Sequence, residues 1–233
     1  MQKIVVLNTK GGCGKTTIAT NLAARFAMSD YQTTLMDQDS QGSSMRWLSK
    51  RSEDLPFVNG IAAYQRNLGV TRSWQLRVPT QTERLVIDTP AALDPQGLTE
   101  VTRNAHAVII PVMPSDIDIH AASRCISDLL LIAKLDRRED RIAVVANRAR
   151  QRTRMFRSLE KFLTSLHIPF VTAFRDTQNY VRCSEKGIGI YELADARADA
   201  DREDWDKLME WIAQRPPSAA QVINGPRVVR STL

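Results

Sequence analysis

The stretch KGGCGKTT, residues 10–17, decides the fold, because it places two lysines around three glycines near the start of the chain. It follows the apolar run KIVVLN (3–8) and opens a segment with apolar residues at helical spacing, 15–29. A glycine-rich turn between a strand and a helix lets backbone amides and the helix N-terminus point at a phosphate. Lys15 would neutralise that phosphate, and the Thr16 hydroxyl would hold Mg²⁺. The sequence therefore predicts a nucleotide-phosphate site.

The rest of the chain alternates apolar runs with helical patterns, which is typical of parallel strands connected by helices. Further buried strands are expected at TTLMD (33–37), RLVID (84–88), AVIIPV (107–112) and RIAVVAN (141–147), with helices over 95–104 and 116–136. We expect an α/β fold with a mostly parallel twisted sheet and helices on both faces, a P-loop NTPase with a single domain over 1–214. Segment 40–83 is assigned only loosely as helix and loop, and 215–233 is expected to be a flexible tail.

Composition narrows the class of protein. The 233 residues carry a formal charge of +6, which favours a polyanionic partner. Three widely spaced cysteines form neither a disulfide framework nor a CxxC site, and a reducing cytosol fits them best. No apolar run approaches the roughly 18 residues that cross a bilayer, and no signal peptide is evident. We expect a cytoplasmic protein with no membrane partner.

Several motifs together resemble one family. KGGCGKTT is similar to the deviant Walker A motif, KGGxGK[ST][ST], of the ParA and MinD group of P-loop ATPases. It departs from the general pattern G-x-x-x-x-G-K-[ST], because Thr9 stands at its first glycine. Four further segments match family motifs in the family's order: MDQDSQGSS (36–44), RLVIDTPA (84–91), PVMPSDIDI (111–119) and VVANRA (144–149). The resemblance is closest to the short ParA-type positioning ATPases.

This resemblance implies ATP and Mg²⁺ as cofactors. Lys10 would be the signature lysine, which reaches the phosphates held by the partner subunit of an ATP-bound homodimer, while Lys15 contacts phosphates in its own subunit. Extra cationic charge beside a γ-phosphate stabilises the transition state, as an arginine finger does. Asn147 would bind the adenine. The implied nucleotide-binding residues are Gly11, Gly12, Cys13, Gly14, Lys15, Thr16, Thr17 and Asn147.

The resemblance also implies different roles for the aspartates at the ends of two expected strands. Asp88 matches the Walker B aspartate that holds Mg²⁺ together with Thr16, and Asp37 would lie near the metal. Asp39 would orient the attacking water, so the implied catalytic residues are Lys10, Lys15 and Asp39. Ser40 stands where the family usually has proline, which leaves the path of this loop open.

A basic segment follows the last expected strand. Arginines at 150, 154 and 157 would share one side of a helix if that helix starts early enough, and Arg182 and Lys186 form an i, i+4 pair. In ParA relatives such residues contact nonspecific double-stranded DNA in the ATP-bound dimer, so a nucleoid-associated protein is expected. The candidate DNA-binding residues are Arg150, Arg152, Arg154, Arg157, Arg182 and Lys186.

The family working cycle adds a cargo-bound activating protein, ParB-like or another adaptor, which stimulates otherwise slow ATP hydrolysis. Two alternatives stay open. A MinD-like spatial regulator would end in a basic amphipathic helix, whereas this tail contains Pro216, Pro217 and Pro226. An ATP-dependent small-molecule ligase of the same superfamily would share the phosphate and metal sites, which alone do not identify the acceptor.

Overall fold

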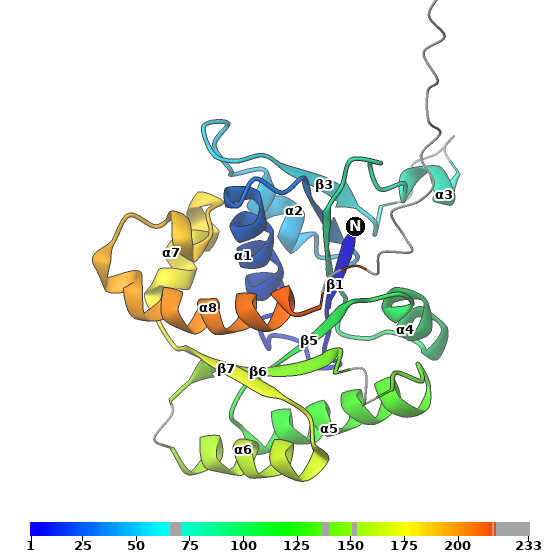
Figure 1. The fold of residues 1–233 in the computed structure, drawn as a ribbon, viewed down its shortest axis with the longest axis vertical. Helices are drawn as coiled ribbons and strands as arrows, with labels where there is room; N and C mark the ends of the chain where they lie inside the picture. The colour runs from blue at the N-terminus through cyan, green and yellow to red at the C-terminus, as the bar shows by residue number, and fades with distance from the viewer. Residues whose placement is uncertain (66–70, 137–139, 151–152, 216, 218–233) are drawn as a thin grey trace, which may run out of the picture.

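The computed structural model describes residues 1–65, 71–136, 140–150, 153–215 and 217 (Figure 1). Within these residues, seven strands form one sheet in the order β3-β2-β4-β1-β5-β6-β7. The strands are β1 (Gln2–Val6), β2 (Thr33–Asp37), β3 (Val58–Ala62), β4 (Arg84–Asp88), β5 (Ala107–Val112), β6 (Ile142–Ala149) and β7 (Phe170–Arg175). Every pairing between neighbouring strands is parallel, so their carboxyl ends share one edge of the sheet.

The helices are α1 (Lys15–Met28), α2 (Ser43–Leu48), α3 (Arg72–Gln75), α4 (Pro95–Thr102), α5 (Asp116–Leu131), α6 (Arg154–Leu166), α7 (Gln178–Lys186) and α8 (Asp199–Ala213), with short 3₁₀ helices η2 (Ile190–Glu192) and η3 (Ala196–Ala198). No helix in the described ranges is both long and apolar enough to cross a membrane.

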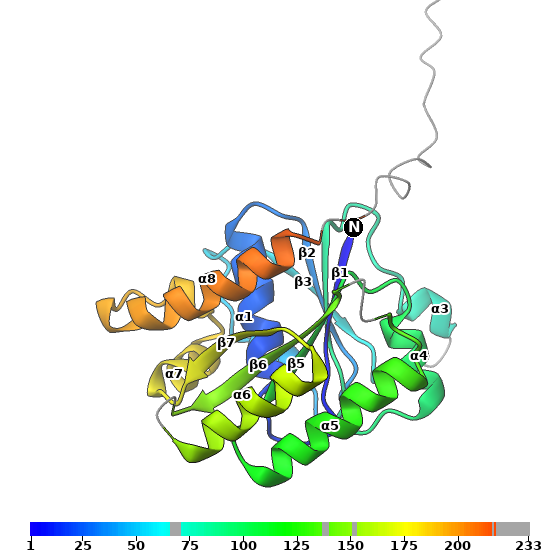
Figure 2. The same ribbon diagram turned by 60° about the horizontal axis from the view of Figure 1, so that its bottom comes forward.

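Two layers of helices cover the sheet, as Figures 1 and 2 show from two directions. Helices α4, α5 and α6 pack on one face around Val5, Ile110 and Val144. Helices α1, α2, α7 and α8 pack on the other face around Ile4 and Ile109. Because alternate residues of a strand point to opposite faces, two adjacent residues of β1 serve two separate cores, and the strands read as continuous apolar runs.

Local sequence signals explain where the helices begin. Ser115, Thr153 and Thr177 stand at the N-caps of α5, α6 and α7, and each side chain accepts a hydrogen bond from a backbone N–H in the first turn. Asp94 caps α4 in the same way, directly before Pro95. Helix α1 is different, because Gly14 stands at its N-cap in the left-handed conformation with no side-chain cap. Its first amides therefore remain for a ligand.

The structure confirms the predicted fold class, and the strands at 33–37, 84–88 and 107–112 have the expected bounds. Two strands were not predicted. Strand β3 lies in the segment that gave no clear pattern, and β7 follows α6. The helix expected over 116–136 was too long, because α5 ends at Leu131. Most of the tail, at 216 and 218–233, lies outside the described residues.

Candidate functional site

The loop between β1 and α1 is shaped by glycines with positive φ. Gly12 has φ of 74° and Gly14 has φ of 100°, a conformation that residues with a Cβ adopt only under strain. A Cβ on Gly14 would lie 1.9 Å from Nδ2 of Asn147, whereas a Cβ on Gly12 would meet nothing within 4 Å. The loop is therefore closely packed at Gly14 and open at Gly12.

Lys15 is anchored within this loop. Its side chain is buried, and the ammonium donates hydrogen bonds to the carbonyl oxygens of Asn8, at 3.3 Å, and Lys10, at 3.1 Å. Asn8 braces the same loop, because its Oδ1 accepts the Lys10 backbone N–H at 3.0 Å and its Nδ2 donates to the Pro111 carbonyl at 2.7 Å. The ammonium is thus held among neutral carbonyls, and a phosphate would be a stronger acceptor for it.

Lys10 is in a different situation. It is half-buried at the rim of the loop, and its backbone carbonyl receives the bond from Lys15. Within the part of the chain that the structure describes, no hydrogen bond or ion pair holds the Lys10 ammonium. The two lysines of the opening stretch are therefore unequal, since one is fixed by its own loop and the other is available to a second molecule.

The candidate metal residues meet where β4 ends beside α1. Oδ2 of Asp88 accepts the Thr16 hydroxyl at 2.8 Å and the Ser44 hydroxyl at 2.7 Å. Oδ1 of Asp88 is buried and has no hydrogen-bond partner among the described residues. Burial raises the pKa of Asp88 to about 6, against the two hydroxyl bonds, which lower it. A buried carboxylate with a free oxygen is a strong attractor for a cation.

These residues fit Mg²⁺ held jointly by protein and nucleotide. No three His, Cys, Asp or Glu side chains of the described ranges form a protein-only metal site. Mg²⁺ commonly takes one or two protein ligands and completes its coordination with phosphate oxygens and waters. Thr16 and Asp88 would supply those ligands, while the loop amides and Lys15 would bind the phosphates. When bound, the metal would neutralise charge that develops during phosphoryl transfer.

Asp37 lies on β2, the strand next to that of Asp88, but its carboxylate accepts hydrogen bonds from backbone N–H groups instead of hydroxyls. It is fully buried, and its carboxylate accepts backbone N–H groups of Asp39, at 3.0 Å, Ser44, at 3.0 Å, and Met45, at 3.2 Å. Burial raises its pKa, although these three amides oppose the shift. In this state Asp37 anchors the N-terminus of α2, so the predicted place near the metal remains a proposal.

Asp39 lies in a tight turn between β2 and α2. Its Oδ1 accepts the Gln41 backbone N–H at 2.9 Å, and its carbonyl accepts the Gly42 N–H at 2.8 Å. This turn is closed with Ser40 in place of the proline usual in the family. The side chain is half-exposed.

A cavity of about 470 Å³ opens beside the first turn of α1, lined by Thr17, Asn147, Arg175, Asp176 and Tyr180 among others. Arg175 is oriented by the buried Asp201, to which its Nη2 donates at 2.7 Å. Asn147 reaches the cavity from the end of β6, and its Nδ2 donates to the Cys13 carbonyl at 2.8 Å. The cavity is large enough for a nucleoside, and Asn147 joins it to the phosphate loop.

Cys13 fills the variable position of the loop. It is fully buried, and burial raises the pKa of its thiol. The thiolate is the reactive form, so a raised pKa and lack of solvent access favour an inert packing role.

The candidate DNA-binding residues come from α6, from the segment before it and from α7. Helix α6 begins at Arg154, so Arg150 precedes it and does not share its face, contrary to the conditional expectation. Arg150 instead lies 3.8 Å from Asp176, and Arg182 lies 3.6 Å from Asp195. Lys186 is exposed in the last turn of α7. Arg152 lies outside the described residues.

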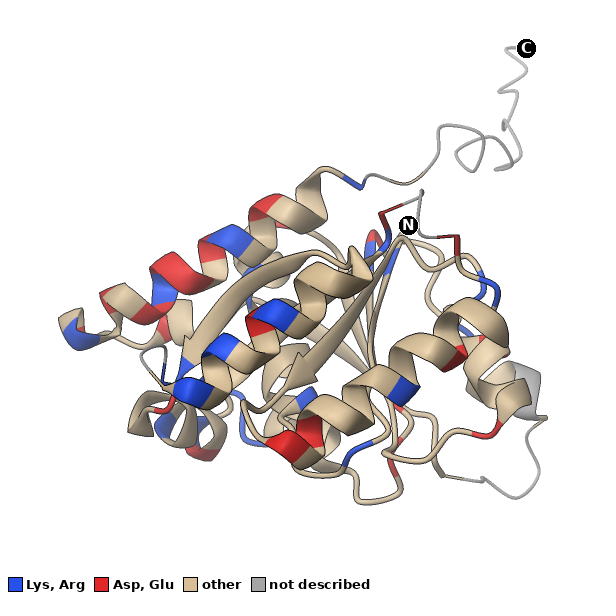
Figure 3. Cartoon of the chain, turned by 90° about the horizontal axis from the view of Figure 1, so that it is seen from below, with Lys and Arg blue, Asp and Glu red and all other residues tan. Residues whose placement is uncertain are grey.

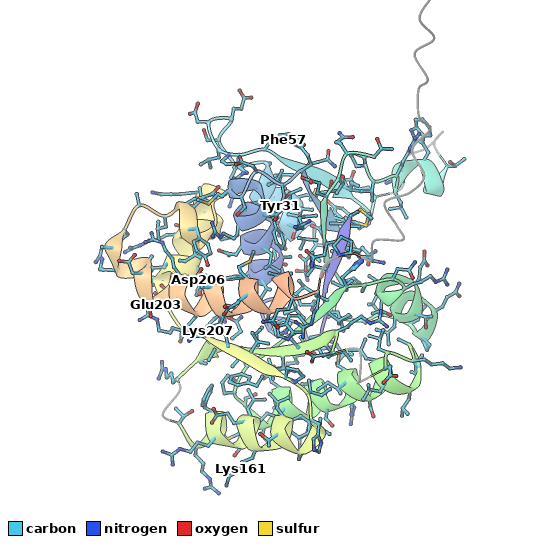
Figure 4. The ribbon with its side chains drawn as sticks, viewed as in Figure 1. Tyr31, Phe57, Lys161, Glu203, Asp206 and Lys207 are labelled. Atoms are coloured by element: carbon cyan, nitrogen blue, oxygen red, sulfur yellow. The ribbon has the colours of Figure 1, made fainter. Side chains whose placement is uncertain are left out.

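A smaller basic row is present on α6. Arg154, Arg157 and Lys161 are exposed at i, i+3 and i+7, and Figure 3 shows blue segments following one another along this helix. Figure 4 shows Lys161 on the outer side of α6, away from the sheet. No salt bridge among the described residues neutralises these three side chains. Lys161 was missed by sequence reasoning, although its spacing from Arg154 and Arg157 would have revealed it.

The parallel sheet, the glycine loop at the end of β1 and the Thr16–Asp88 pair define a P-loop nucleotide-binding protein. Residues 4–190 match the model of the CobQ/CobB/MinD/ParA nucleotide-binding domain, and the chain belongs to that family.

Two relatives named maintenance of carboxysome distribution protein A extend over most of the chain. The protein of Gloeobacter kilaueensis is 30% identical over 216 residues, which cover 89% of this chain and 92% of the relative. The protein of Halothiobacillus neapolitanus is 28% identical over 200 residues, covering 85% and 91%. An ATP complex of a McdA variant from Cyanothece superposes with a TM-score of 0.67 at 15% identity, covering 90% of this chain and 96% of that one, which shows a shared fold.

Proposed function

We propose that this protein is a ParA-like positioning ATPase, which closes into a homodimer on Mg²⁺ and ATP and distributes a cargo in the cell. The contrast between the two lysines carries this proposal. Lys15 is buried and bonded to the carbonyls of its own loop, so it is placed for phosphates bound by its own subunit. Lys10 has no partner for its ammonium among the described residues and stands at the rim. A phosphate bound by a second copy would satisfy it.

The chemistry is phosphoryl transfer to water. The loop amides, Lys15 and the metal would hold the phosphates, and Asp39 would orient the attacking water. No histidine or other strong base lies among the residues of the loop and metal site described above. Hydrolysis would therefore rely on positioning and be slow until a partner improves the geometry. An unstimulated turnover above about 10 per second, the median for enzymes, would contradict this.

The polyanionic partner is nonspecific double-stranded DNA, bound mainly through Arg154, Arg157 and Lys161 on α6. Their side chains are exposed, and none forms a salt bridge within the described residues, as phosphate contacts require. Arg182 and Arg150 contribute less, because each lies near an aspartate. Closing two subunits doubles the number of phosphates that can be bound, which makes DNA binding depend on ATP. Such a protein would be associated with the nucleoid.

The cargo is proposed to be a large protein assembly, because the two relatives that span most of this chain are named for carboxysome distribution. Three relatives named for chromosome partitioning match at most 41% of this chain. A cargo-bound adaptor protein would stimulate hydrolysis and release the dimer from DNA.

Light scattering tests the dimer directly. The molar mass of the purified protein is measured without nucleotide, with Mg²⁺-ADP and with a slowly hydrolysed ATP analogue, for the wild type and for Lys10→Ala. The expected result is a doubled mass with the ATP analogue only, lost in the variant although the analogue still binds. A wild-type monomer saturated with the analogue would contradict the proposal.

A further inference from the structure

Ser44 joins two carboxylates that come from neighbouring strands. Asp37 and Asp88 are register partners at the ends of β2 and β4. The Ser44 hydroxyl donates to Oδ2 of Asp88 at 2.7 Å, and the Ser44 backbone N–H donates to Oδ2 of Asp37 at 3.0 Å. Ser44 is completely buried, so both bonds are shielded from water and are stronger than exposed ones. A single residue therefore ties the first turn of α2 to both strands.

The other end of α2 is held by the segment that follows α7. The indole N–H of Trp47 donates to the Ile188 carbonyl at 3.2 Å. Just beyond the helix, Arg51 forms a salt bridge with Glu192, and both side chains are almost wholly buried. Arg51 also donates to the Gly187 carbonyl at 3.2 Å. Helix α2 thus connects the carboxylates to the end of α7.

We propose that Ser44 is a positioning residue that makes α2 respond to metal binding at Asp88. Thr16 and Ser44 donate to the same oxygen of Asp88, but only Ser44 belongs to α2. A cation bound to this carboxylate attracts the same negative charge that the Ser44 hydroxyl interacts with, and so weakens the hydrogen bond from Ser44 to Asp88. The strength of this hydrogen bond therefore depends on whether the metal is bound. The inference rests on the metal role proposed above for Asp88.

A movement of α2 would also affect the residues that contact its C-terminal end. A change at the Ser44 hydroxyl shifts the first turn of a helix that has only six residues. A helix of this length has fewer than two turns, and each backbone hydrogen bond connects residues near its two ends. A shift of the first turn therefore moves the whole helix. Trp47 and Arg51 would then carry the change to the segment at 187–192, next to Lys186 at the end of α7.

Three variants separate the possible roles. Ser44→Ala removes the bond to Asp88 and keeps the backbone bond to Asp37. Ser43→Ala is the matched control, because the neighbouring hydroxyl is half-exposed and accepts a bond from Arg46 at 3.0 Å. Asp88→Asn tests the metal site itself, since an amide is a much weaker ligand for a divalent cation.

Mn²⁺ is the metal probe, and its binding to each variant saturated with ADP is measured by electron paramagnetic resonance. Groups that orient a metal ligand typically contribute 10- to 100-fold in affinity. We therefore expect Ser44→Ala to weaken Mn²⁺ binding by about 10-fold, while Ser43→Ala matches the wild type. Equal affinity in the two serine variants overturns the role of Ser44. Unchanged Mn²⁺ binding in Asp88→Asn contradicts the proposed metal site instead.

Hydrogen exchange of the peptide covering 43–51 provides a readout that does not depend on activity. In the wild type, Mn²⁺ added to the ADP-bound protein changes the exchange of this peptide. In Ser44→Ala at saturating Mn²⁺ that change is lost, and Ser44→Thr, which keeps a hydroxyl, restores it. A Ser44→Ala protein with faster exchange but a wild-type response to Mn²⁺ would show that Ser44 only stabilises α2, and would overturn the proposal.

Discussion

The ammonium of Lys15 lies 3.1 Å from the carbonyl oxygen of Lys10, so the two lysines of the loop contact each other through one side chain and one backbone group. This hydrogen bond holds Lys15 inside the loop and leaves the Lys10 side chain outside it. The pair is therefore arranged for two separate tasks, one within the subunit and one beyond it.

Exchanging either lysine for alanine should give different defects. Lys15→Ala removes a charged donor to phosphate, and such bonds contribute about 1.5–3 kcal/mol, or about 10- to 100-fold in affinity. Lys10→Ala leaves the loop intact and should change nucleotide affinity little. Titration with a fluorescent ATP analogue distinguishes the two, and equal losses in both variants would refute the division of tasks.

Gly14→Ala should destabilise the protein and disrupt the loop. The alanine would have to adopt the φ of 100° that Gly14 has, and its Cβ would lie 1.9 Å from Nδ2 of Asn147. Backbone strain of this kind costs about 1–3 kcal/mol. Gly11→Ala is the matched control, because its Cβ would meet only Ala91 at 4.0 Å. Urea unfolding of both variants checks this, and equal stabilities would show that the left-handed turn is not required.

The metal-free protein should lose stability as the pH rises because of Asp88. Burial raises the pKa of this carboxyl from 3.8 to about 6, so the folded protein holds the proton more tightly than the unfolded chain does. Stability from this group is complete below pH 3.8 and is lost as the pH rises through 6.

The comparison with Asp88→Asn isolates that contribution. Relative to the variant, the wild type should lose about 1 kcal/mol in free energy of unfolding between pH 5 and 7. Urea unfolding without Mg²⁺ or nucleotide provides the measurement. A pH-independent difference would mean that Asp88 is already ionised at pH 5 in the folded protein.

Removing the row on α6 should weaken DNA binding without affecting nucleotide binding. The double variant Arg157→Ala with Lys161→Ala should reduce the salt dependence of DNA affinity, by about 1 in the log-log slope for each DNA phosphate that the protein no longer neutralises. Lys207→Ala is the control, since Lys207 is exposed on α8, which covers the other face (Figure 4). An unchanged slope in the double variant would place the DNA elsewhere.

Strands and helices with simple patterns could be predicted from the sequence, and others could not for identifiable reasons. Strand β4 is apolar from Leu85 to Ile87, between the charged Arg84 and Asp88, so its bounds were predicted correctly. Strand β3 contains Asn59 and Gly60, which disfavour strands. Gly60 packs closely against α2, because a Cβ there would lie 2.4 Å from Cδ2 of Leu48. Strand β7, by contrast, had a readable signal in its apolar residues after Pro169.

Some features of the candidate site could likewise be predicted from the sequence, and others could not. The loop, Lys15, Thr16 and Asp88 were predicted as one group, and the structure brings Thr16 and Asp88 together. Ser44 lies in a motif recognised from the sequence, yet its bonds to two carboxylates depend on the register of β2 against β4. A register between distant segments is not visible in local sequence.

The most direct test of the proposed cycle is binding to nonspecific duplex DNA at two salt concentrations. It is measured with ATP, with ADP and without nucleotide, for the wild type and for Lys10→Ala. We expect salt-sensitive binding with ATP alone, abolished in the variant. Wild-type binding that is absent or equally strong in every nucleotide state, while ATP still binds, would contradict an ATP-gated DNA-binding dimer.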